Sequence, residues 1–79
     1  MSNRLWDKKQ KAFREAIKEV RVKSGLTQVL LAKKLKKPQS FVSKYETGER
    51  KLDFVEVVEI CKVCGISIKE FEKFYSKNI

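Results

Sequence analysis

Apolar residues recur at helical spacing along most of the chain, in five segments separated by short polar joints. The first segment carries one apolar face, with residues at i, i+3, i+4 and i+7: Phe13, Ala16, Ile17 and Val20. Asp7 and Gln10 have the spacing of a capping box, and Ser24-Gly25 is a typical helix end. The pattern predicts a first helix from near Asp7 to Ser24, preceded by an N-terminal arm over residues 1–6.

Two short helices joined by about three residues are predicted next. Thr27 is a typical N-cap residue for the first of them, which runs to Leu35. Lys36-Lys37 forms the joint, and Pro38 opens the next helix, where its missing N–H does no harm. The inward-facing residues of the pair are Leu31, Ala32, Leu35, Val42 and Tyr45. Thr47-Gly48 ends the second helix, so residues 27–47 read as a helix-turn-helix.

Two further capping-box patterns, Asp53 with Glu56 and Ser67 with Glu70, predict the last two helices. Their apolar stripes are Phe54, Val57, Cys61 and Cys64, then Ile68, Phe71, Phe74 and Tyr75. No strand-like alternation, repeat or linker is visible, and 79 residues suffice for one small domain. We therefore expect an all-α, compact five-helix bundle over residues 1–79, with a C-terminal helix within residues 66–79.

Charge is distributed unevenly. The formal net charge is +9, but residues 1–51 carry a net +10 and residues 52–79 a net −1. A basic first part indicates a polyanionic partner, and a neutral last part indicates another role. A solvated Lys-rich surface is the plainer alternative.

The face of the predicted helix 38–47 that lies opposite Val42 and Tyr45 is polar and free of acidic residues. It consists of Gln39, Ser40, Ser43, Lys44 and Thr47. Gln pairs with adenine and Lys with guanine in the major groove, while Ser and Thr contact bases or phosphates. Because the second helix of a helix-turn-helix enters the major groove, this face predicts binding to double-stranded DNA. An ordinary exposed helix face is the alternative, although such faces usually include Asp or Glu.

The residues of this motif carry a specific resemblance. The stretches "LTQ" (26–28), "LA" (31–32), "QSFVSKYETGER" (39–50) and "GIS" (65–67) stand at the spacings of the Cro/phage-repressor, or Xre-type, helix-turn-helix family. The chain resembles this family from about Phe13 to Phe71. The resemblance implies the fold of a phage-repressor DNA-binding domain and a sequence-specific transcriptional regulator, in particular a repressor.

The resemblance also implies roles for matching positions. Gln39 and Ser40 match the principal base readers, and Lys44 a further base or phosphate contact. Gln28 matches a residue that contacts a phosphate and braces the recognition helix. Other family backbone contacts fall at Ser43, Thr47 and Arg50. Arg21 and Glu46 match a buried ion pair with a structural role.

The sequence departs from the family pattern at several positions. Lys36 stands where the family often has a Gly with positive φ, at a strain of about 1 kcal/mol. Val29 and Leu30 replace acidic residues, and we expect the arm, with Leu5 and Trp6, to cover them. Phe41 lies between core and groove, where core packing is favoured over contact with a thymine methyl group.

Single-domain members of the family often act as homodimers on palindromic operators. The charge-poor C-terminal third offers apolar residues for such a surface: Val55, Val63, Phe74, Tyr75 and Ile79. The alternative is that these residues cover the first helix.

Catalytic and metal chemistry find little support. The chain has no His, and Cys61 with Cys64 alone cannot supply four zinc ligands. Both cysteines take core positions, which favours reduced, buried thiols. We expect no enzyme activity, no cofactor and no metal, and, without a signal peptide or transmembrane run, a cytoplasmic protein away from membranes.

Three other functions stay open at this stage. An antitoxin-like or adaptor protein would use the same fold to bind a protein partner, as the apolar excess at Val29, Leu30 and the C-terminus suggests. RNA binding lacks the usual motifs. Non-specific DNA coating would use the charge without readout by Gln39 and Ser40.

Overall fold

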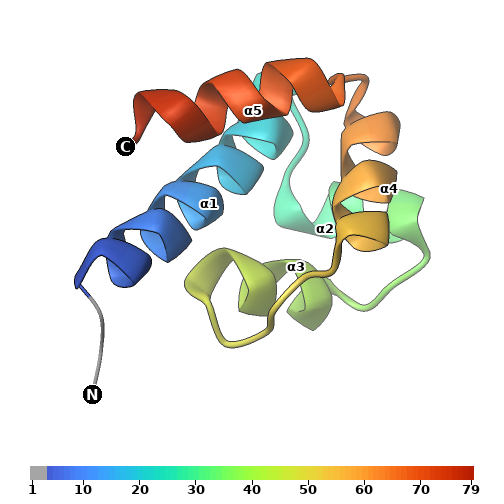
Figure 1. The fold of residues 1–79 in the computed structure, drawn as a ribbon. Helices are drawn as coiled ribbons and strands as arrows, with labels where there is room; N and C mark the ends of the chain where they lie inside the picture. The colour runs from blue at the N-terminus through green and yellow to red at the C-terminus, as the bar shows by residue number, and fades with distance from the viewer. Residues whose placement is uncertain (1–3) are drawn as a thin grey trace.

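The computed structural model describes residues 4–79, and these form five α-helices and no strand (Figure 1). The helices are α1 (Arg4–Lys23), α2 (Gln28–Leu35), α3 (Gln39–Thr47), α4 (Phe54–Cys64) and α5 (Ile68–Lys77). In Figure 1, α5 runs back along α1, while α2, α3 and α4 enclose the other side. The predicted all-α, five-helix architecture is confirmed.

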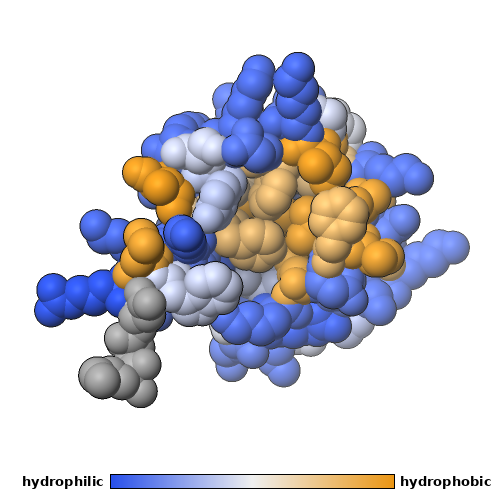
Figure 2. All heavy atoms as spheres, viewed as in Figure 1, coloured by the Kyte–Doolittle hydropathy of each residue, from blue (hydrophilic) through white to orange (hydrophobic). Residues whose placement is uncertain are grey.

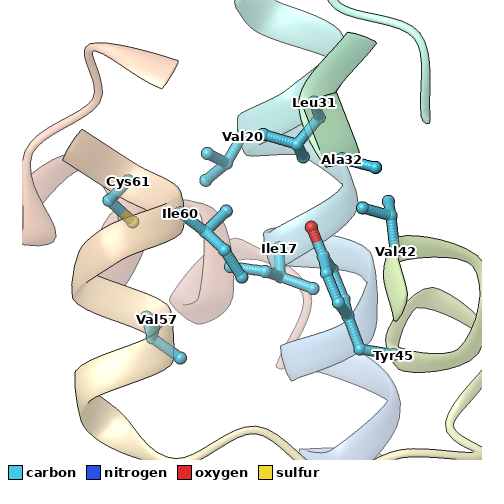
Figure 3. Packing of buried hydrophobic residues seen from close by; sticks show 9 residues of the cluster. All are labelled: Ile17, Val20, Leu31, Ala32, Val42, Tyr45, Val57, Ile60 and Cys61. Carbon is cyan, nitrogen blue, oxygen red and sulfur yellow. The ribbon is translucent and has the colours of Figure 1, made fainter. Parts of the chain in front are cut away.

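Four of the five helices build the core (Figure 3). Its buried members come from α1, α2, α3 and α4: Ile17, Val20, Leu31, Ala32, Val42, Tyr45, Val57, Ile60 and Cys61. Helix α5 has no buried residue and packs against this cluster through half-buried Phe71 and Phe74. The ring of Phe71 meets that of Phe13 edge-on, with centroids 5.8 Å apart. The apolar stripes predicted from spacing face inward except at their first residues in α4 and α5, since Phe54 is 70% exposed and Ile68 is 38% exposed.

Local capping interactions fix the helix starts. The Thr27 hydroxyl oxygen accepts from the Leu30 N–H at 3.1 Å. Asp53 accepts from the Glu56 N–H at 2.8 Å, while the Glu56 carboxylate accepts from the Asp53 N–H at 2.9 Å. Ser67 and Glu70 form the same reciprocal box. The starts predicted for α2, α4 and α5 are confirmed. Each of these helix starts is determined by only two or three neighbouring residues, which makes it readable from the sequence.

Helix α1 begins at Arg4, three residues before the predicted start. Leu5 and Trp6 therefore lie in its first turns rather than in an arm, and residues 1–3 of the expected arm lie outside the described residues. Asp7 and Gln10 are within the helix and form no capping box. No Gly or Pro interrupts the helix here, and Asp7 lies where a carboxylate favours the helix dipole.

Two further expectations need correction. Pro38 is the N-cap residue of α3, so the helix begins at Gln39, one residue after the start predicted from the sequence. Val29 and Leu30 are not covered by the first turns of α1, since their side chains are 52% and 46% exposed. Trp6 instead lines a cavity to which Gly48 also contributes.

Candidate functional site

The polar face of α3 points away from the core. Gln39, Ser40, Lys44 and Thr47 are exposed and Ser43 is half-buried. On the opposite face, Val42 and Tyr45 are buried against the other helices. The structure therefore brings the five predicted groove-facing residues together on one side of a nine-residue helix.

Lys36 directs the chain from α2 into α3. Its backbone is left-handed, with φ 59° and ψ 43°, and it has the only positive φ among the described non-glycine residues. The Lys37 N–H donates to the Ala32 carbonyl at 3.0 Å and the Lys36 N–H to the Lys33 carbonyl at 3.1 Å. These bonds satisfy the last carbonyls of α2 and close a tight turn. The left-handed conformation expected at this position is present although the residue is not Gly.

An ion-pair network joins α1, the loop that follows it, and α3. Arg21 Nε lies 2.7 Å from Glu46 Oε2, and Arg21 Nη2 donates to Glu46 Oε1 at 3.1 Å. A third donor, Arg21 Nη1, reaches the Leu26 carbonyl at 3.0 Å. The pKa of Arg21 lies above its ordinary value mainly because its side chain donates to Glu46. The network ties the end of α1 to the end of α3.

Gln28 joins this network from the start of α2. Its Nε2 donates to Glu46 Oε1 at 3.0 Å, so the side chain braces the last turn of α3. The sequence suggested a bracing role but not the partner. Because the bond uses one hydrogen of the amide group, a second side-chain N–H and the backbone N–H at the start of α2 stay free for an anion.

Arg50 lies beside α3, where it stacks on an aromatic ring. Its guanidinium lies 4.7 Å from the centroid of Phe41, and its two terminal nitrogens contact the Glu56 carboxylate at 3.1 and 2.9 Å. Glu56 Oε1 also accepts from the Asp53 N–H. The sequence assigned Glu56 to helix capping alone. Its second function, holding Arg50, depends on a contact that spacing does not reveal.

Phe41 packs toward the core rather than standing free in the groove. It is half-buried, and its ring meets the Tyr45 ring edge-on at 5.4 Å. The Lys37 ammonium lies 5.5 Å from the same ring. Core packing, the favoured expectation, agrees with this position.

The apolar C-terminal residues do not form one surface. Val55 is 68% exposed and lies beside Leu35 and Phe41, whereas Ile79 is 60% exposed and lies beside Leu5. The other three are half-buried: Val63, Phe74 and Tyr75. Phe54, with 70% of its side chain exposed, was not among the expected surface residues. Figure 2 shows hydrophobic side chains gathered over α4 and the adjoining end of α5.

The two cysteines of α4 lie in or against the core. Both are free thiols, with Cys61 buried and Cys64 half-buried. Burial raises the pKa of the Cys61 thiol to about 11 and also raises that of Cys64. Residues 4–79 contain no group of three or more side chains placed to hold a metal ion. Within the same residues, every helix is too short or too polar to span a bilayer.

Comparison with known proteins gives one match. A family model described as helix-turn-helix matches residues 17–71, which include Arg21, both helices of the motif and the start of α5. No curated protein and no solved structure matches the chain. The matched span covers well over half of the 79 residues.

Proposed function

Because the chain belongs to the Cro/phage-repressor, or Xre-type, family of helix-turn-helix DNA-binding domains, we propose that it is a sequence-specific transcriptional repressor. The family accounts for DNA binding and transcription regulation in general. The exposed, non-acidic polar face of α3 is the observation that supports direct base readout. In this proposal α3 enters the major groove, with α2 lying across its outer end.

Base readout falls to three residues of α3. Gln39 and Ser40 occupy its first turn, the end that meets base edges in this motif, and Lys44 lies one turn later. All three side chains are exposed. Gln39 favours adenine and Lys44 favours guanine, since their donors and acceptors match those base edges.

Phosphate contacts position the helix. We assign this role to Gln28, Ser43, Thr47 and Arg50, which flank the reading face. Arg50 is held in place by Phe41 and Glu56, so its guanidinium is ordered before DNA arrives. Because Glu56 neutralises part of its charge, Arg50 contributes more to orientation than to long-range attraction.

A homodimer on a palindromic operator completes the proposal, because one half-site offers few base contacts. Of the expected surface residues, exposed Val55 at the start of α4 is the one we favour for this contact, together with the neighbouring exposed Phe54. We place the protein in the cytoplasm, where such regulators meet DNA. An adaptor that binds a protein partner is the second candidate, and exposed Val29 and Leu30 support it.

Selection of genomic fragments bound by the purified protein, followed by titration at fixed salt, tests the proposal. We expect an enriched motif whose affinity falls steeply with salt, because phosphate contacts release counterions. Gln39→Ala should relax preference at one base position by about 1–3 kcal/mol, whereas Arg50→Ala should weaken all sequences alike.

Lys62→Ala serves as the matched control, since it removes one charge from the exposed side of α4. Recovery of no enriched motif would contradict sequence-specific regulation. If Gln39→Ala and Arg50→Ala change affinity and base preference in the same way, the division between base-reading and phosphate-contacting residues is wrong. Light scattering that gives a single-chain mass at high concentration would contradict the homodimer.

A further inference from the structure

A cavity of about 430 Å³ lies between α1, α5 and the segment that follows α3. Its walls are largely aromatic: Trp6, Phe13, Tyr45, Phe71 and Tyr75. Figure 2 shows hydrophobic rings near the centre of the molecule in this view, bordered on one side by the hydrophobic side chains over α4 and on the other sides mainly by hydrophilic ones. The volume is within the range of small-molecule sites, which are also mostly apolar and aromatic.

The charged residues that line this cavity are all cationic. They are Lys9, Arg14, Arg50 and Lys51, and no carboxylate lines the cavity. Lys51 donates to Gln10 at 3.2 Å, and the guanidinium of Arg50 is directed to Phe41 and Glu56. Of these four cations, Arg50 has a carboxylate partner, whereas Lys9, Arg14 and Lys51 form no ion pair with a carboxylate among residues 4–79.

Arg14 is the cation best placed to hold a ligand. It is half-buried and lies directly over Gly48, where an added Cβ would stand 3.1 Å from Arg14 Cδ and 3.3 Å from its Nε. The Arg14 side chain therefore lies close against the end of α3, where the absence of a side chain at Gly48 leaves room for it. A half-buried guanidinium lacks the full solvation of water, and a carboxylate bound at both nitrogens would restore its electrostatic balance.

We propose that this cavity binds a small aromatic carboxylate. The ring of the ligand would pack between the aromatic walls, and its carboxylate would lie against Arg14. A second copy of the chain fits less well, because the cationic rim would face another chain of net charge +9. This site lies beyond the proposed function, since ligand binding here requires no DNA.

Calorimetric titration of the purified protein with 2-naphthoate tests the proposal, in parallel with neutral 2-naphthamide and with inorganic phosphate. We expect one saturable naphthoate site and at least tenfold weaker binding of the amide, because the amide has the ring without the charge. Phosphate alone should give no saturable binding. Trp6 is the single tryptophan, so its indole N–H resonance should shift with naphthoate.

Arg14→Gln should weaken naphthoate binding at least tenfold, and Arg14→Lys should retain part of it. Lys62→Gln is the matched control, since it removes one charge from outside the cavity and should bind as the parent does. Circular dichroism verifies that each variant is folded. Equal binding of acid and amide, no saturation, or an unaffected Arg14→Gln variant would overturn the proposal. If the chain dimerises at higher protein concentration and naphthoate binding is lost at the same time, a second copy of the chain occupies the cavity and the proposal is overturned.

Discussion

Arg21 and Glu46, 25 residues apart in the sequence, form a two-point ion pair in which their side chains are only 12% and 4% exposed. Glu46 also accepts from Gln28, so one carboxylate serves two partners from two helices. The last turn of α3 is therefore held by a guanidinium from α1 and an amide from α2. The exposed polar side of the same helix stays free of this network.

Glu46→Ala should destabilise the protein by about 3 kcal/mol, because it leaves the half-buried Arg21 guanidinium without its counterion. Urea denaturation followed by circular dichroism measures the change in the free energy of unfolding. The double variant Arg21→Gln with Glu46→Gln is the control. It should lose less free energy of unfolding than Arg21→Gln and Glu46→Gln lose together, since it leaves no buried charge without a counterion. A loss below about 0.5 kcal/mol for Glu46→Ala, the size of an ordinary surface change, would contradict the structural role.

Tyr45→Phe should leave the stability unchanged or raise it by up to about 1 kcal/mol. Tyr45 is 1% exposed, and its hydroxyl has no hydrogen-bond partner among the described residues. Burial also raises the pKa of Tyr45, so the phenol stays protonated. Removing the hydroxyl removes a desolvated group and breaks no bond.

Thermal unfolding of the Tyr45→Phe variant checks this expectation. Tyr45→Leu is the control, because it removes the ring that packs against Phe41 and should be clearly less stable. If Tyr45→Phe unfolds as easily as the Leu variant, the hydroxyl has a bonding role that the surrounding residues do not explain.

Lys36→Gly should stabilise the protein by up to about 1 kcal/mol, because glycine adopts positive φ without the steric cost that a Cβ adds. The gain is reduced by the greater freedom of glycine in the unfolded chain. Lys36→Ala removes the same charge but keeps the Cβ, so it should show little change. Chemical denaturation of the three proteins compares them, and a Gly variant no more stable than the Ala variant would argue against strain at this turn.

The contact between Arg50 and Glu56 should make stability depend on pH in the acidic range. Arg50 donates to Glu56, and the Asp53 N–H adds a second bond, so the pKa of Glu56 lies below its ordinary value. A lowered carboxyl pKa stabilises the fold above the unfolded value of about 4.3, and this contribution is lost as pH falls through the folded pKa. Both side chains are partly solvated, so the contribution is small.

Unfolding of the parent and of Glu56→Gln across pH 7 to 2 measures this effect. The parent should be the more stable at neutral pH, and the difference should shrink in acid. Glu59→Gln is the control, because Glu59 is an exposed acid on the same helix that forms no ion pair with another described residue. A difference that grows in acid would have the wrong sign for this contact.

The sequence predicted helix ends well where two or three neighbouring residues determine them. Thr27, Asp53 and Ser67 begin their helices as expected, and Gly48 and Gly65 end theirs with positive φ. The start of α1 was predicted wrongly because Asp7 and Gln10 have the spacing of a capping box, although no helix-breaking Gly or Pro directly precedes them. A capping pattern does not stop a helix that continues favourably on its N-terminal side.

The candidate site was less predictable where it depends on distant side chains. The Arg21–Glu46 pair and a bracing role for Gln28 were expected from family resemblance, but the Glu46 partner of Gln28 and the stacking of Arg50 on Phe41 were not. These contacts depend on how α2 and the segment after α3 are placed by the core. The aromatic cavity was missed for the same reason, since its walls come from residues as far apart in the sequence as Trp6 and Tyr75.

Helix α5 is the one helix that contributes no buried residue, and this makes the stability of the molecule uneven. Helices held by few buried contacts open locally at low free energy, so the amide hydrogens of α5 should exchange with solvent soonest. Val42 and Tyr45 anchor α3 in the core, so we expect its amides to exchange more slowly than those of α5. The helix proposed to meet DNA should therefore keep its shape when α5 opens locally beside the aromatic cavity.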